Sequence, residues 1–368
     1  MIFITIMSQF ILYASLATLM GTFILKLMPE TLRPSFEISS KWLYMSSSVI
    51  PIVAFVPNIQ LLMILTPQFG FVDSLWTIIS KYKVGHAWVT ILLFTLVLLI
   101  VVSASTKSKK KILSVAIITL LIAIIAAMAY VSHASSMKPI AGEAFDFIHL
   151  FAVSIWLGIL IIISFFSTNS NNWEAFLKWF SPTALVAFSA IALSGVLLID
   201  AIVPAYVTGW ASKYGQWLFI KHVLLLPLTF IVLGNGLLIK LKIEKPLFEP
   251  RTWVKIETGL LIAILAITAI FSEQQPPMSF VQSENVSALF QVFNSSVVET
   301  GMTAHFQMTG IGIMFFLLTA VFIVLLVLTY FKEAAVIIVI SMAIAVALCF
   351  YMGFNSITVF NFIGYCVT

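Results

Sequence analysis

Long apolar runs separated by short polar breaks occupy almost the whole chain. A run of about 20 apolar residues crosses the hydrocarbon core of a bilayer as a helix, and ten such runs can be counted in the sequence. The pattern therefore predicts an all-α fold, a polytopic transmembrane bundle of about ten helices. The predicted spans are 2–28, 41–65, 84–104, 112–132, 143–167, 178–200, 215–240, 253–272, 308–331 and 334–354.

Two features modify this simple pattern. Pro51 and Pro57 fall inside the second span, where each removes a backbone donor and favours a kink. The longest stretch between spans, 273–307, is too short to form a core of its own. Its segment 284–299 places apolar residues at helical spacing, which predicts an interfacial helix on the outer surface. These apolar residues are Val286, Leu289, Phe290, Phe293 and Val297.

Charge sets the expected orientation. The chain is 61% hydrophobic and 9% charged, with a mean hydropathy of +1.13. Lysine and arginine favour cytoplasmic loops, and 14 of the 19 flank the odd-numbered loops. We therefore expect these loops in the cytoplasm and both termini outside, with the first apolar run retained as a helix. The 14 residues are Lys26, Arg33, Lys41, Lys107, Lys109, Lys110, Lys111, Lys178, Lys240, Lys242, Lys245, Arg251, Lys255 and Lys332.

Composition also excludes some functions. The net charge of +5 is divided among short loops, which is an anchoring pattern and not a nucleic-acid signal. The sequence has no glycine-rich phosphate-binding loop, which argues against an ATP-driven pump. Nothing in it indicates bond-making catalysis, so we do not expect an enzyme.

Histidine is the residue type that carries candidate chemistry. The chain has five, each at or near the end of a span, and the threading places all five on the outer side. Histidine is the commonest side-chain metal ligand and is costly inside lipid. Five on one side suggest a metal or haem site. They are His86, His133, His149, His222 and His305.

The strongest pair lies across the loop between spans four and five. His133 ends span four, and His149 lies about two turns into span five. Asp146 precedes His149 by three residues and shares its helix face, so it could fix the imidazole tautomer or bind the metal itself. Imidazole must be neutral to bind a metal, so capture should weaken below about pH 6.

Three further residues are candidate ligands. His86 begins span three, and His222 lies about two turns into span seven, at a depth similar to that of His149. Met137 follows His133 by four residues. A thioether combined with imidazole suits copper, particularly Cu(I). The alternative for each residue is an ordinary structural role at a helix end or a helix contact.

Several short motifs resemble the copper resistance protein D (CopD) family of bacterial membrane proteins. The most specific is His149-Leu150 followed by Trp156-Leu157-Gly158, preceded by His133 and Asp146. The remaining motifs follow in the family's order and extend the resemblance over roughly residues 1–277. They are Tyr214-Gly215, Lys221, Asn235, Arg251, Glu257 and Pro276-Pro277.

The resemblance implies copper import across the bacterial cytoplasmic membrane. It implies a division into an eight-helix transmembrane domain at 1–277, an extracellular amphipathic loop at 278–307, and two additional helices with a tail at 308–368. In that family a small extracytoplasmic copper-binding protein or a fused domain often serves as donor. This chain departs from the pattern through its C-terminal extension and through the lack of a soluble copper-binding domain, which leaves the donor and the role of His305 open.

Two alternatives remain. His149 and His222, on different helices, could hold one haem b in an electron-transfer protein. A relay across the membrane usually needs a second pair at the inner side, where this chain has no histidine. Copper sensing, or copper delivery without transport, would require the same outer site as transport.

Overall fold

A bundle of helices forms the protein, as the apolar pattern predicted. The computed structural model describes residues 2–242, 249–294 and 296–362. Within these residues, ten helices are long and apolar enough to cross a membrane, and they fall on the ten predicted runs. An all-α polytopic membrane bundle is therefore confirmed.

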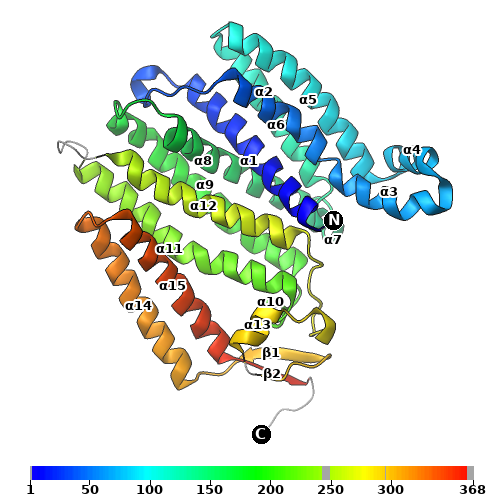
Figure 1. The fold of residues 1–368 in the computed structure, drawn as a ribbon, viewed down its shortest axis with the longest axis vertical. Coiled ribbons are helices and arrows are strands. Elements are labelled where there is room, and N and C mark those ends of the chain that lie inside the picture. Colours follow the sequence, from blue (N-terminus) through cyan, green and yellow to red (C-terminus); the bar gives the residue numbers. More distant parts are fainter. Residues whose placement is uncertain (1, 243–248, 295, 363–368) are drawn as a thin grey trace. The chain divides into compact units, whose positions relative to one another are not determined.

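The chain divides into two compact units, residues 1–202 and 203–368, called here unit 1 and unit 2 (Figure 1). The helices of unit 1 are α1 (Ile2–Leu27), the short 3-10 helix η1 (Glu30–Leu32), α2 (Ser40–Val53), α3 (Val56–Phe69), α4 (Phe71–Lys81), α5 (Lys83–Lys107), α6 (Lys111–Ala129), α7 (His133–Met137), α8 (Ala141–Phe166) and α9 (Trp173–Ile202). Unit 2 contains α10 (Tyr206–Gly209), α11 (Lys213–Lys242), α12 (Pro250–Ser272), η2 (Ser283–Asn285), α13 (Ala288–Phe293), β1 (Met302–Phe306), α14 (Gly310–Phe331), α15 (Val336–Ile357) and β2 (Thr358–Phe362).

Helix α1 is the centre of unit 1. It packs along α8 and also contacts α2 and α6. Its apolar side chains meet those of α5 and α6 in a continuous buried core. Leu19, Met20 and Phe23 are fully buried there.

Two glycines determine how closely α1 and α8 approach. A side chain on Gly21 would overlap the backbone of Gly158, and one on Gly158 would overlap the Ala17 carbonyl. Lipid tails are as apolar as leucine, so helices in a bilayer associate through close packing of small residues rather than through the hydrophobic effect. The glycine of the Trp156-Leu157-Gly158 motif therefore has a packing role: it sets the position of the helix that carries His149.

The second span is broken at its prolines, as predicted. Helix α2 ends at Val53 and α3 starts at Val56. The Trp88 indole on α5 donates a hydrogen bond to the Pro51 carbonyl at 2.9 Å. A side chain from a neighbouring helix thus satisfies a carbonyl that the break takes out of the helical ladder.

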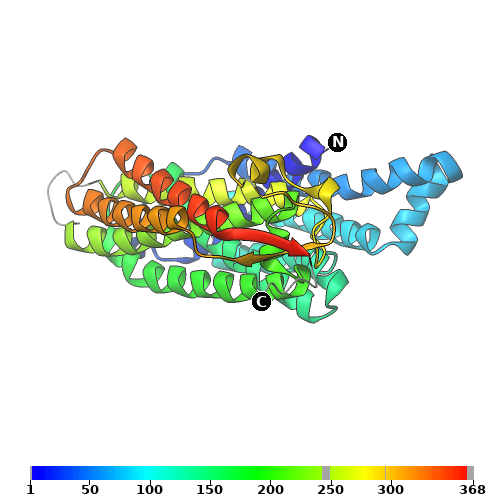
Figure 2. The ribbon, with the colours of Figure 1, turned by 90° about the horizontal axis from the view of Figure 1, so that it is seen from below.

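Unit 2 is built around α11. Helices α12, α14 and α15 all pack against it, and α14 and α15 lie side by side along their length (Figure 2). Strands β1 and β2 pair antiparallel, with Ala304 opposite Phe360. The sequence pattern did not predict this pairing because the two strands lie more than 50 residues apart and neither shows a clear alternation of polar and apolar residues.

The predicted interfacial helix at 284–299 is wrong in extent. The structure has a 3-10 turn at Ser283–Asn285 and then only the six residues of α13. The Ser287 amide donates to the Ala211 carbonyl at 2.7 Å, which keeps the chain extended before α13. After it, the Asn294 amide side chain donates to the carbonyls of Asn355 and Thr358, at 2.9 and 3.0 Å. These tertiary hydrogen bonds override the helical spacing.

The contact of α1 with α8 leads to a prediction. Gly158→Ala should destabilise the protein by about 1–3 kcal/mol or more, because the added methyl group has only backbone to displace. Gly259→Ala on α12 is the matched control, since nothing lies within 4 Å of the site of its methyl group. Thermal unfolding in detergent, followed by size-exclusion chromatography, measures the difference. Equal stability of the two variants would show that the crossing tolerates separation.

Candidate functional site at one end of unit 1

His133 and Met137 are the two ends of α7, a five-residue helix between α6 and α8. The Ser132 hydroxyl caps this helix by accepting a hydrogen bond from the Ser135 amide at 3.1 Å. The Ser135 hydroxyl donates to the Tyr130 carbonyl at 2.8 Å, which holds the turn against the end of α6. As a result, both the imidazole and the thioether are exposed at the surface.

Helix α7 is fixed to its neighbours on two sides. A side chain at Gly142, at the start of α8, would overlap the Ala134 carbonyl, so the two backbones touch. Lys138 forms an ion pair with Asp200 at 2.6 Å, which ties the turn before α8 to the end of α9. Both partners are largely exposed, so the pair contributes orientation more than stability.

His149 is held by a chain of hydrogen bonds. Its Nδ1 lies 3.1 Å from the Ser194 hydroxyl oxygen on α9. The Ser194 hydroxyl donates its own hydrogen to the Ala190 carbonyl at 2.5 Å. Because that hydrogen is used, the hydroxyl oxygen acts as acceptor and the Nδ1–H donates to it. In a neutral ring this tautomer leaves the lone pair on Nε2, the form that a metal needs.

Gly195 lies next to this ring. A methyl group at Gly195 would lie 3.6 Å from the His149 Cε1, an ordinary contact distance. Ser194 on α9 therefore supplies the hydrogen-bond acceptor, and Gly195 lies beside the ring. Sequence reasoning missed Ser194, because one serine in an apolar helix gives no signal until its partner is known.

The site has depth. Gly142 touches α7, and His149 follows it by seven residues on α8, which corresponds to about 10 Å along the helix axis. Asp146 and Glu143 occupy the intervening turns, and both are partly buried. His133 and Met137 are thus at the surface, and His149 lies farther along α8 from that surface.

His86 lies at the same end of unit 1, in the first turn of α5. Its ring is exposed, and its Nε2 lies 3.0 Å from the Ser80 carbonyl. A carbonyl only accepts, so Nε2 carries the hydrogen. Three residues earlier, the Lys83 ammonium lies 5.2 Å from the centre of the Tyr130 ring, next to the α7 turn. The start of α5, which carries His86, therefore lies next to the end of α6 and the α7 turn that carries His133.

His222 belongs to unit 2. Its Nδ1 lies 2.6 Å from the Tyr206 hydroxyl of α10, and the Tyr206 ring stands edge-on to Trp210. Burial raises the pKa of Tyr206 to about 12, so the phenol keeps its hydrogen at physiological pH. His222 thus has a short hydrogen bond to a neighbouring helix, which is a structural role in its own right. His305, also in unit 2, is exposed on β1 opposite Val359.

The predicted ligands divide between the two units. Among the residues that the structure describes, no three His, Cys, Asp or Glu side chains converge closely enough to hold a metal ion. Five of the predicted ligands share one end of unit 1. His86, His133 and Met137 are exposed there, and Asp146 and His149 lie farther along α8.

Unit 2 contains a buried polar pair. The Asn235 side-chain amide of α11 donates to Glu257 of α12 at 2.8 Å and to the Trp253 carbonyl at 3.2 Å. Both side chains are buried. A carboxyl group within a membrane span is costly unless it is hydrogen-bonded. The pair therefore joins two spans through polar atoms that lipid could not satisfy.

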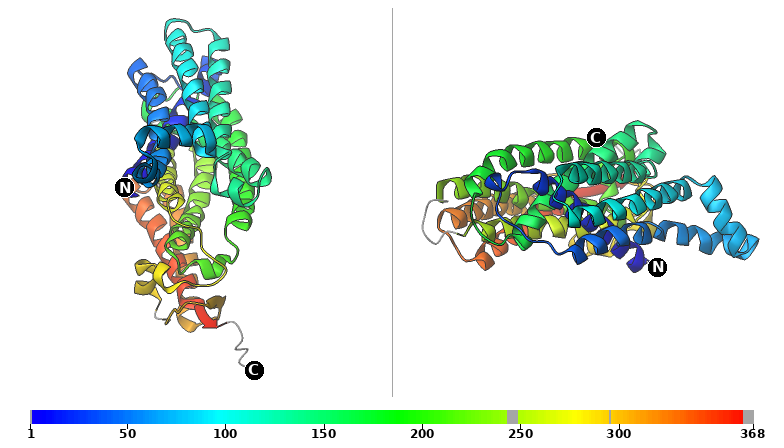
Figure 3. Two further views of the ribbon diagram at one scale, coloured as in Figure 1. Left: turned by 90° about the vertical axis from the view of Figure 1, so that its right-hand side faces the viewer. Right: turned by 90° about the horizontal axis from the view of Figure 1, so that it is seen from above.

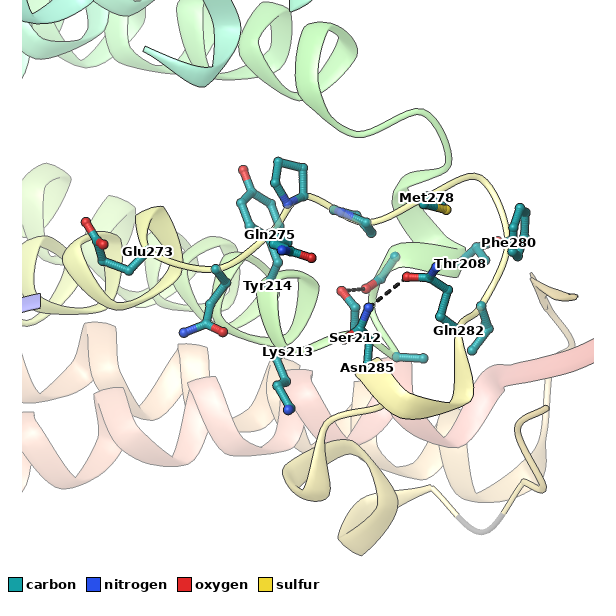
Figure 4. Close-up of a pocket in the computed structure, with 16 residues that line it drawn as sticks. Thr208, Ser212, Lys213, Tyr214, Glu273, Gln275, Met278, Phe280, Gln282 and Asn285 are labelled. Atoms are coloured by element: carbon teal, nitrogen blue, oxygen red, sulfur yellow. Dashed lines mark hydrogen bonds between the residues drawn. The ribbon is translucent and has the colours of Figure 1, made fainter. Parts of the chain in front are cut away.

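Unit 2 also has a polar pocket of about 310 Å³ (Figure 4). It lies between the start of α11 and the loop that follows α12. The Gln282 side-chain oxygen accepts a hydrogen bond from Asn285 at 2.7 Å, and the Ser212 hydroxyl donates to the Gly209 carbonyl at 2.7 Å. Met278 contributes a thioether to the lining of this pocket, and no histidine lines it. The chemistry of the pocket therefore differs from that of the unit 1 site.

Comparison with known proteins gives two family matches. Residues 174–271 match a family model described as copper resistance protein D, and residues 1–143 match one described as the copper resistance protein D-like N-terminal domain. Copper transport protein CutJ of Bacillus subtilis (strain 168) is 30% identical over 158 residues, which covers 41% of this chain and 29% of that protein. The match therefore spans less than a third of the relative's length. No solved structure matches the chain.

The hydrogen bonds around His149 lead to a prediction that needs no metal. Ser194→Ala should remove the acceptor at Nδ1 and shift the ring towards a mixture of tautomers. Nitrogen NMR of histidine-labelled protein would detect this shift, with His149→Gln assigning the signal. Ser189→Ala, an exposed serine on the same helix, should leave the signal unchanged. An unaltered spectrum in Ser194→Ala would contradict the assigned tautomer.

Proposed function

Because the chain belongs to the copper resistance protein D family, we propose that it imports copper across the bacterial cytoplasmic membrane and captures the ion at the exposed end of unit 1. One observation carries the site assignment: His133, Met137, Asp146 and His149 follow one another along the same end of two neighbouring helices. The proposal is a transporter, not an enzyme, and copper is its cargo.

Capture would begin at α7. An exposed imidazole and an exposed thioether at the two ends of one short helix form a set suited to Cu(I). The copper would arrive either as a free ion or from an extracytoplasmic donor protein. His86 is a further ligand at the same surface, supported by the contact of Lys83 with Tyr130.

The second step would move the ion about 10 Å deeper, to His149. Asp146, on the same face of α8, provides negative charge for a cation that leaves water. A transported ion must be bound well enough to enter and weakly enough to leave. Successive sites with few ligands meet this requirement better than one closed cage. We also propose His222 of unit 2 as an additional ligand.

Two forces would drive import. A membrane potential of 100 mV favours entry of one positive charge by about 2.3 kcal/mol. Tight copper binding inside the cell would then keep the free ion low. The proposed orientation, with α7 outside, rests on the distribution of lysine and arginine, 14 against 5.

Two substitutions test the site. His149→Ala and His133→Ala should each lower copper-dependent uptake in cells by at least about tenfold, since the loss of a partner to a metal ligand already costs that much. Ser136→Ala, an exposed residue within α7, is the control and should not change uptake. Uptake that stays normal in both histidine variants would make the site assignment wrong, provided membrane levels are equal.

The visible spectrum tests the haem alternative. We expect protein purified in mild detergent to show no Soret band and to bind copper, with less copper in His133→Ala and His149→Ala. A Soret band stoichiometric with protein would instead make His149 and His222 haem ligands. Those two residues belong to different units.

A further inference from the structure

Helix α4, which connects α3 and α5, is the most clearly amphipathic helix of unit 1. At 100° per residue, its apolar side chains occupy one continuous arc and its polar side chains the opposite one. The apolar arc consists of Phe71, Val72, Leu75, Trp76, Ile78 and Ile79, and the polar arc of Asp73, Ser74, Thr77, Ser80 and Lys81.

The packing of α4 leaves three of the six side chains in its apolar arc exposed. One edge of the helix is fixed to α5: Ile78 is fully buried, and a side chain on Gly85 would overlap its carbonyl. Elsewhere in the arc, Phe71, Val72 and Trp76 are 59%, 75% and 69% exposed. An arc of large apolar side chains exposed to this degree requires a partner.

The length and direction of α4 identify the environment of this arc. Its 11 residues span about 16 Å, roughly half of the hydrocarbon core, so α4 cannot cross a membrane. Gly70 ends α3 with a φ of +78°, a left-handed turn that redirects the chain. Figure 3 shows α4 crossing between the far ends of α3 and α5, not running along them. If α3 and α5 cross the bilayer, α4 lies in its plane.

The length of the preceding span gives the same result. Residues 40–69 form one candidate span of 30 residues, about 45 Å of helix at 1.5 Å per residue. This exceeds the core thickness of about 30 Å, even allowing for the proline break. The end of α3, and α4 after it, therefore reach the interface. Trp76 and Lys81 are residue types enriched there.

We propose that α4 is a lipid-binding helix whose apolar arc inserts into the headgroup–acyl boundary of the leaflet on the α7 side. The occupant of this face is the bilayer itself. Both ends of α4 are joined to spanning helices, so no separate docking partner has to be recruited.

This placement also bears on copper capture, a consequence that rests on the proposed function. His86 follows α4 by five residues, and its Nε2 donates to the Ser80 carbonyl at 3.0 Å. The exposed residues of the polar arc, Asp73, Ser80 and Lys81, would then face water, with His86 at the level of the lipid headgroups. An ion that approaches along the membrane surface would meet this imidazole.

Spin labels on the full chain test the proposal. With Cys349 and Cys366 replaced by serine, a nitroxide is attached to Trp76→Cys or, as the control on the polar arc, to Ser80→Cys. The protein is reconstituted in vesicles of phosphatidylethanolamine and phosphatidylglycerol. We expect the label at 76 to collide severalfold more with oxygen than with a water-soluble nickel chelate, and the label at 80 to show the reverse.

Other outcomes would overturn the proposal. Equal access of nickel to both labels would place α4 in water. Protection of the label at 76 from both reagents would show that protein covers the arc, and dipolar broadening would then identify a second copy of the chain. Val72→Asp should lower the oxygen preference of the label at 76 severalfold. No copper enters the measurement, so its result is independent of the transport proposal.

Discussion

The contact of Gly21 with Gly158 is the constraint on which unit 1 depends. Helix α1 packs against α8, α2 and α6, so its distance from α8 sets the position of both halves of the unit. The hydrophobic effect does not drive helix association inside a bilayer, so close packing of the backbones has to stabilise the contact. The same helix α8 carries Asp146 and His149 towards one end and touches α7 through Gly142. Packing in the middle of the bundle therefore determines where the candidate ligands lie.

Packing determines the position of these side chains, and polar contacts then fix their orientation. The Ala190–Ser194–His149 chain selects one imidazole tautomer. The Ser132 cap and the Lys138–Asp200 pair hold the α7 turn between α6 and α9. Each of these groups would be costly in lipid without its partner. The hydrogen bonds that satisfy these polar groups near the end of an apolar bundle are thus the same ones that form the candidate site.

The sequence predicted the spans well because a helix in lipid must satisfy its own backbone, which makes long apolar runs unambiguous. Short elements were not predicted, because they do not follow from the apolar pattern of one segment. Helices α4 and α7, the β1–β2 pair and the limits of α13 depend on tertiary contacts, such as Ser287 with Ala211. The candidate ligands were identified from residue type and depth. Their partners Ser194 and Tyr206 could not be, because each lies on a different helix from its histidine.

In the proposed function, the arrangement of the candidate ligands is also what would distinguish a transported ion from a resident metal. A structural metal site gathers its ligands into one closed shell. Such a shell binds the ion too tightly for the release that transport needs. Along α7 and α8 the ligand types occur in sequence: an exposed thioether and imidazole, then a carboxylate, then an imidazole with a fixed tautomer. Each step towards lipid raises the cost of a bare cation. The carboxylate and the oriented nitrogen occur where that cost begins to rise, which is the order that the proposed stepwise entry would require.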